Sequence, residues 1–167
     1  MYSRGNGVER SEKKAAQLYR KAAELGDSFA QYILGNSYEQ GEGVAKNYKM
    51  AAFWYRKAAE QNESSAQFSL AVLYLDGKGV PKDIDEAVHW CSKAAEQDDA
   101  DALFLLAQLC ESGTGVPQDL RKAIEMYARF NSLDGRLAAW SKKLRAHWSG
   151  SGTWLGTAID FRQRRTC

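Results

Sequence analysis

The stretch Gly41-Glu42-Gly43-Val44 decides the fold, because the same pattern occurs three more times at a fixed distance. Glycine–x–glycine–valine also stands at 5–8, 77–80 and 113–116, so that successive copies lie 36 residues apart. A dinucleotide-binding loop would need a third glycine where Lys46 stands, and a strand before it. A fixed period of this length is instead typical of stacked-repeat proteins. The glycines therefore predict turns in a repeat array rather than a nucleotide site.

Each period contains two helical patterns. In the first pattern, apolar residues recur at steps of four and predict helices beginning at Ala30, Ala66 and Ala102. The second pattern follows the glycine loop, and residues that favour the N-cap stand at its start: Ser11, Asn47, Asp83 and Asp119. Asp83 with Glu86 also has the spacing of a capping box. These second helices should end near residues that tolerate a left-handed backbone: Gly26, Asn62, Asp98 and Asp134.

The predicted domain is one array that covers residues 1–148. It consists of a partial unit at 1–29, full units at 30–65, 66–101 and 102–137, and a capping helix at 138–148. Leu137, Trp140, Leu144 and Trp148 form the apolar stripe of that last segment, and 149–167 is expected to be a flexible or irregular tail. The chain begins in mid-repeat, which suggests a truncated N-terminus. The compartment, cytoplasmic or periplasmic, therefore stays open.

Composition excludes several classes of function. Hydrophobic residues make up 44% and charged residues 26%, and the net charge of +2 offers little attraction to nucleic acid. No apolar run approaches 18 residues, so membrane insertion is not expected. The three cysteines, Cys91, Cys110 and Cys167, lack the spacing of a zinc site, and the first two replace tyrosines of other repeats as core residues.

Candidate catalytic groups are few. His89 and His147 stand far apart, and His89 occupies an outer position that is Phe53 and Glu125 in other units. The acidic run at 97–101 lies between helices, where helix capping explains it better than a calcium loop. We therefore expect no catalytic residues, no cofactor and no metal.

The repeat resembles the Sel-one-like repeat (SLR) family, which is related to the tetratricopeptide repeats. The residues that carry the resemblance in one unit are Ala66, Leu70, Ala71, Tyr74, Gly77, Gly79, Val80, Asp83, Ala87, Trp90, Lys93, Ala94 and Ala95. The resemblance covers residues 1 to about 140. It implies an all-α, right-handed superhelical solenoid of antiparallel helix pairs with a 36-residue period. It also implies an adaptor for protein complexes, and a bacterial source is expected for short arrays of this kind.

A partner-binding groove follows from the same resemblance, because tetratricopeptide-like arrays turn their first helices toward a concave groove. The residues opposite the core stripe are Tyr32, Asn36, Glu39, Phe68, Val72, Leu75, Phe104, Gln108 and Glu111. The aromatic residues among them either line the groove or pack against the adjacent helix. Val72 and Leu75 differ from their counterparts in other repeats, which favours a binding role.

Two functions are compatible with these observations. The first is a non-enzymatic scaffold, monomer or weak dimer, that binds a protein or peptide in the groove. In a dimer, 154–161 of one copy could occupy the groove of the other. The alternative is binding or hydrolysis of β-lactams or cell-wall fragments, as in cysteine-rich members of the family. Those members carry a regular pair of cysteines in each repeat, and this chain does not.

Overall fold

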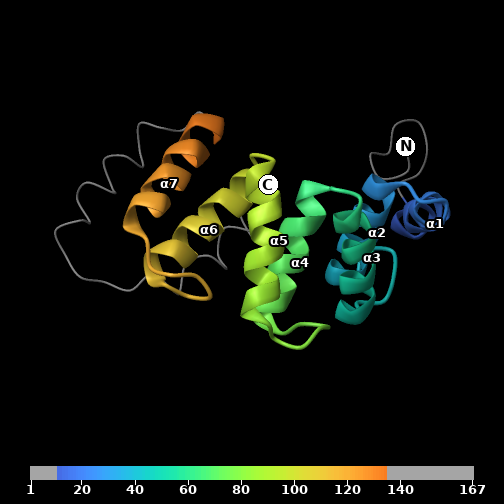
Figure 1. The fold of residues 1–167 in the computed structure, drawn as a ribbon. Coiled ribbons are helices and arrows are strands. Elements are labelled where there is room, and N and C mark those ends of the chain that lie inside the picture. The colour runs from blue at the N-terminus through green and yellow to red at the C-terminus, as the bar shows by residue number, and fades with distance from the viewer. Residues whose placement is uncertain (1–10, 135–167) are drawn as a thin grey trace.

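The computed structural model describes residues 11–134, and these residues form seven α-helices joined by short loops (Figure 1). The helices are α1 (Glu12–Glu24), α2 (Ser28–Gln40), α3 (Tyr48–Glu60), α4 (Ser64–Asp76), α5 (Ile84–Glu96), α6 (Ala100–Ser112) and α7 (Leu120–Asp134). Each helix packs against the next one along the chain, so the array is built from local contacts. The predicted all-α solenoid of antiparallel helix pairs with a 36-residue period is confirmed. We call α2, α4 and α6 the first helices, and α1, α3, α5 and α7 the second helices.

The predicted caps of the second helices are present. Ser11 accepts from the backbone N–H of Lys14, and the side chains of Asn47, Asp83 and Asp119 do the same for the first turns of α3, α5 and α7. The capping box is only half formed. The Glu86 backbone donates to Asp83, but the Glu86 carboxylate accepts from Trp90 Nε1 at 3.0 Å and does not return to the cap.

The first helices begin two residues earlier than the apolar pattern predicted, at Ser28, Ser64 and Ala100. Side-chain caps explain two of these starts. Asp27 accepts from the Ala30 backbone at 2.6 Å, and Asp99 accepts from the Ala102 backbone at 3.0 Å. The connections that precede them turn through a left-handed residue, as predicted: Gly26 (φ 99°), Asn62 (φ 65°) and Asp98 (φ 59°).

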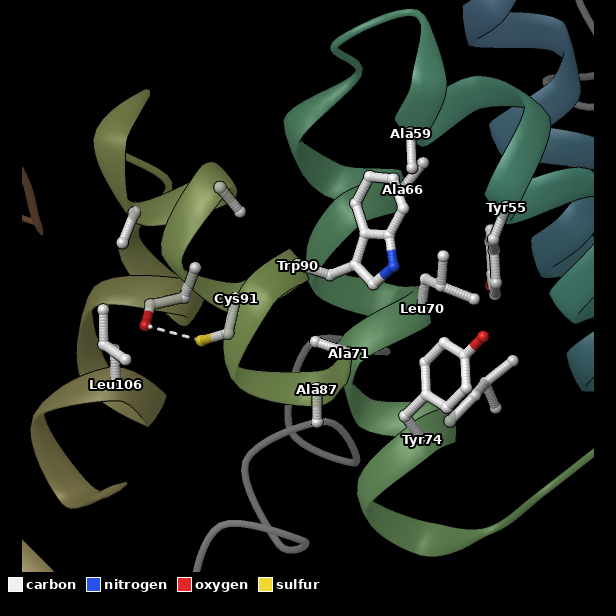
Figure 2. Close-up of a cluster of buried hydrophobic side chains, with 14 of the residues drawn as sticks. Tyr55, Ala59, Ala66, Leu70, Ala71, Tyr74, Ala87, Trp90, Cys91 and Leu106 are labelled. Carbon is white, nitrogen blue, oxygen red and sulfur yellow. Dashed lines mark hydrogen bonds between the residues drawn. The ribbon is translucent and has the colours of Figure 1, made fainter. Parts of the chain in front are cut away.

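The core is built from small residues on one helix and large residues on the next. Leu34, Leu70 and Leu106 are buried along the predicted stripe. Gly35 leaves room for Tyr55, because a Cβ there would lie 2.6 Å from the Tyr55 ring. Figure 2 shows the central part of this core, where Trp90 of α5 lies over Ala59 and Ala66.

The predicted core role of the cysteines is confirmed. Cys91 is buried and its Sγ donates to the Ala102 carbonyl at 3.3 Å (Figure 2). Cys110 is also buried. The predicted capping helix at 138–148 and the tail at 149–167 lie outside the described residues.

Candidate protein-interaction surface

One stripe on each first helix is left partly uncovered by the core. The stripes follow helical spacing, and we name them together the first-helix face: Phe29, Tyr32, Ile33 and Asn36 on α2; Phe68, Val72 and Leu75 on α4; Asp101, Phe104, Leu105, Gln108 and Glu111 on α6. Phe29 (56% exposed) and Glu111 are exposed, and the others are half-buried. The face is therefore mostly apolar and partly open to solvent across all three units.

Eight of the nine predicted groove residues belong to this face. They are Tyr32, Asn36, Phe68, Val72, Leu75, Phe104, Gln108 and Glu111. The prediction is wrong for Glu39, which is only 6% exposed. Leu75 is half-buried and packs against the hydrophobic core. The polar residues among the prediction that remain on the face are Asn36, Gln108 and Glu111.

Glu39 is buried because it has a specific partner in its own unit. The Tyr55 hydroxyl donates to Glu39 Oε2 at 2.7 Å. A hydrogen bond to a charged acceptor offsets part of the cost of removing a carboxylate from water. In the last unit, the Tyr127 hydroxyl donates to the equivalent carboxylate, that of Glu111, at 3.0 Å. Burial raises the pKa of the Tyr127 hydroxyl, and the negative charge of Glu111 raises it further.

This pair also explains why Leu75 differs from its counterparts. In the middle unit, the tyrosine position is Cys91 and the glutamate position is Leu75. A carboxylate without a hydroxyl donor would be costly to bury, so both positions change together. The difference between Leu75 and its counterparts is therefore explained by the absence of a tyrosine at position 91.

The aromatic residues of the face also contact the second helices. The Tyr32 ring lies 5.9 Å from that of Tyr55. The Phe104 ring lies 5.7 Å from Tyr127 and 5.3 Å from Phe130. These contacts show that Tyr32 and Phe104 pack against the second helices, while both residues stay partly exposed.

The charges are divided between the two helix classes. The first helices contain no lysine or arginine, and their acidic residues are Glu39, Asp76, Asp101 and Glu111. Lysine and arginine are instead found on all four second helices. Asp76 forms an ion pair with Lys78 at 2.8 Å. The carboxylates of Asp101 and Glu111 thus give the α6 part of the face a negative character.

The remaining candidates for chemistry have structural roles. His89 is exposed and contacts Trp90 edge to face at 5.2 Å. Asp99 caps α6, and Asp98 pairs with Arg129. Burial raises the pKa of the Cys91 thiol to about 12, which suppresses thiolate formation. No group of three potential metal ligands occurs within residues 11–134.

Two repeated side-chain pairs between helices were missed by sequence reasoning. Gln61 donates to Gln31, and Gln97 donates to Gln67, each at 2.8 Å. Arginine donates to a tyrosine hydroxyl in Arg20–Tyr38 and Arg56–Tyr74. In the next unit both partners of each pair change together. The two glutamines become Leu103 and Leu133, and the arginine and tyrosine become Ser92 and Cys110. Joint change at a fixed offset between repeats is the signal that could have found them.

The Sel1 repeat family model matches residues 1–27, 28–63, 64–99 and 100–134. No curated protein matches the chain. None of the helices in the described part of the chain is long and apolar enough to cross a membrane.

Three solved structures illustrate the similarity. The protective antigen c5321 of uropathogenic Escherichia coli, which displays an SLR fold, is 36% identical with a TM-score of 0.76; the match covers 79% of this chain and 28% of that one. A Sel1 repeat protein from Oxalobacter formigenes is 40% identical with a TM-score of 0.73, covering 78% and 54%. Helicobacter pylori cysteine rich protein B is 27% identical with a TM-score of 0.58, covering 81% and 94%. This chain thus spans about a quarter and about half of the first two structures.

Proposed function

Because the chain belongs to the Sel1 repeat family, whose members generally serve as protein-interaction scaffolds, we propose that it is a non-enzymatic adaptor that binds a protein or peptide on the first-helix face. The observation that carries the proposal is the partly exposed apolar stripe found on each of α2, α4 and α6. Partly exposed apolar surface of this kind is typical of interaction sites. Tyr32 and Phe104 are already held by ring contacts, so little of their side-chain entropy would be lost on binding.

The site differs from the one predicted from sequence. Glu39 is buried and is not part of the proposed contact surface. Phe29, Ile33 and Leu105 join it, since each is exposed or half-buried on the same side of a first helix. The polar members Asn36 and Gln108 would orient the partner by hydrogen bonds at either side of Val72.

The test compares two phenylalanines of similar exposure on different helix classes. Phe29 (56% exposed) belongs to the first-helix face, and Phe53 (47% exposed) lies on second helix α3. A partner captured from a source-cell lysate should be lost with Phe29→Glu and with Val72→Glu, and retained with Phe53→Glu. Circular dichroism must first show that all variants keep their helical content. Equal capture by the three variants would place the contact elsewhere.

The enzymatic alternative has no support among the described residues. Cys91 and Cys110 are free thiols in the core, and no nucleophile–base pair accompanies them. Nitrocefin should therefore remain intact in the presence of the full chain. Turnover that scales with protein concentration and persists through purification would contradict the non-enzymatic assignment.

A further inference from the structure

The C-terminal part of the chain is opposite in charge to the helical array. Residues 135–167 contain seven lysines and arginines and one acidic residue, whereas residues 11–134 contain 14 basic and 19 acidic residues. Within the C-terminal part, 154–165 combines Trp154 and Phe161 with Arg162, Arg164 and Arg165. The segment therefore carries basic residues, which the first-helix face lacks, and aromatic residues, which an apolar stripe can accommodate.

The α6 part of the face has the matching arrangement. Asp101, Phe104, Gln108 and Glu111 stand at steps of three and four residues, so they share one side of the helix. An aromatic ring is thus placed between two carboxylates, with Leu105 beside it and no basic residue on any first helix. Such a surface favours an apolar segment that is flanked by arginines.

The connection is long enough for the segment to reach this surface in its own molecule. Tyr127 contacts Glu111, Phe130 contacts Phe104, and Arg129 pairs with Asp98, so α7 runs antiparallel to α6. The chain therefore leaves Asp134 beside the N-terminal end of α6, where Asp101 stands. Residues 135–153 can span up to about 60 Å when extended. Because the segment and the face belong to one chain, binding between them would be intramolecular.

We propose that residues 154–165 bind the first-helix face of the same chain, with the aromatic residues on the apolar stripe and the arginines beside Asp101 and Glu111. The segment acts as a built-in occupant that an external partner must displace. The inference rests on the proposed function for the identity of the surface. It adds that a competing partner carries aromatic residues next to basic ones.

The test measures where the end of the chain lies in the full-length protein. Cys91 and Cys110 are buried, so a thiol-reactive spin label is directed to Cys167, and mass spectrometry checks the site. We expect paramagnetic loss of amide signals on α6 and α4 at the first-helix face. The amides of Phe53, His89 and Glu125, which are exposed on second helices, should keep their intensity.

Charge reversal makes the test specific. Arg162→Glu/Arg164→Glu/Arg165→Glu should abolish the signal loss, and adding Asp101→Lys/Glu111→Lys to that variant should restore it. The matched control, Asp85→Lys/Glu125→Lys, changes two exposed carboxylates on second helices and should leave the signal loss of the unmodified chain unchanged.

Three results would overturn the proposal. They are an absence of signal loss on the first-helix face, a loss that survives the arginine reversal, and a loss that appears only between a spin-labelled copy and an isotope-labelled copy. The last result would assign the segment to a second molecule. Partner capture with Phe29→Glu and Val72→Glu is independent of all three, so failure of this inference is distinguishable from failure of the proposed function.

Discussion

The two glycines of each loop have different physical roles. Gly41, Gly77 and Gly113 end the first helices in a left-handed conformation. The second glycine contacts the preceding unit. At Gly79 (φ 74°), an added Cβ would lie 2.2 Å from the Tyr48 carbonyl oxygen and 2.7 Å from the Lys49 nitrogen. Backbone approach between units therefore requires glycine at this position.

This difference predicts unequal costs for two glycine substitutions. Gly26→Ala adds a Cβ at a left-handed residue, with no atom within 4 Å of it. The backbone strain alone should lower the free energy of unfolding by about 1–2 kcal/mol. Gly79→Ala adds a backbone collision to the same strain and should cost about 3–4 kcal/mol. Urea unfolding followed by circular dichroism measures both values. Equal losses would show that the loop moves away from α3 at little cost.

The two buried tryptophans differ in one hydrogen bond. Trp90 Nε1 donates to Glu86, but Trp54 Nε1 is buried and finds no acceptor among the described residues. The residue equivalent to Glu86 in that unit is Met50. A buried donor without a partner costs about 1–3 kcal/mol.

Met50→Glu should therefore stabilise the protein at neutral pH. The new carboxylate stands four residues before Trp54, as Glu86 stands before Trp90, and can accept the indole proton. We expect a gain of about 1 kcal/mol after the loss of methionine packing. Thermal unfolding measures the change, and Met50→Gln serves as the uncharged control. A loss of stability with both variants would mean that methionine packing outweighs the hydrogen bond.

At the scale of the element, glutamine side chains join successive helix pairs. Gln67 is fully buried, donates to the Ala59 carbonyl near the end of α3 at 3.1 Å, and accepts from Gln97 after α5. In the last unit, Leu103 replaces the glutamine, and Arg129 donates to the equivalent carbonyl, that of Ala95, at 3.3 Å. A carbonyl near the end of α1, α3 and α5 thus accepts from a side chain of the next unit.

A double-mutant cycle tests this connection. Gln67→Leu leaves the Ala59 carbonyl and the Gln97 amide without their partner, and should cost about 2–3 kcal/mol. Gln67→Leu/Gln97→Leu copies the last unit and should recover about 1 kcal/mol of that loss, because only the carbonyl then lacks a donor. Urea denaturation of the four proteins gives the coupling. Strict additivity would show that the two glutamines act independently.

The sequence predicts elements better than it predicts partners between elements. The helix pairs and their caps follow from short-range features such as Asn47 or the glycine loop, which act within a few residues. The burial of Glu39 depends on the Tyr55 hydroxyl 16 residues away, so the wheel pattern of α2 alone places it wrongly on the surface. The partly exposed positions of Val72 and Phe104 could be predicted, because the side of the helix on which they lie follows from spacing alone.

At the scale of the whole molecule, the described array is stabilised mainly by contacts between helices that are neighbours along the chain. The central helices α4 and α5 lie between α3 and α6, and buried residues of all four helices form the main core. On α7, Leu120 and Ile124 are 44% and 53% exposed, although the equivalent Ile84 and Val88 on α5 are half-buried. The described residues thus contain a well-covered centre and less-covered ends.

This gradient predicts unequal local stability along the array. In a repeat protein, each unit gains stability from its interfaces, so units with one interface open first. Native-state hydrogen exchange should show the slowest amides in α4 and α5, with opening free energies about 2 kcal/mol or more above those of α1 and α7. Ala66→Gly in the centre should lower the protection of all helices, whereas Ala16→Gly in α1 should act mainly on α1. Uniform protection in the unmodified chain would contradict this view and indicate one cooperative unit, in which the ends are held as firmly as the centre.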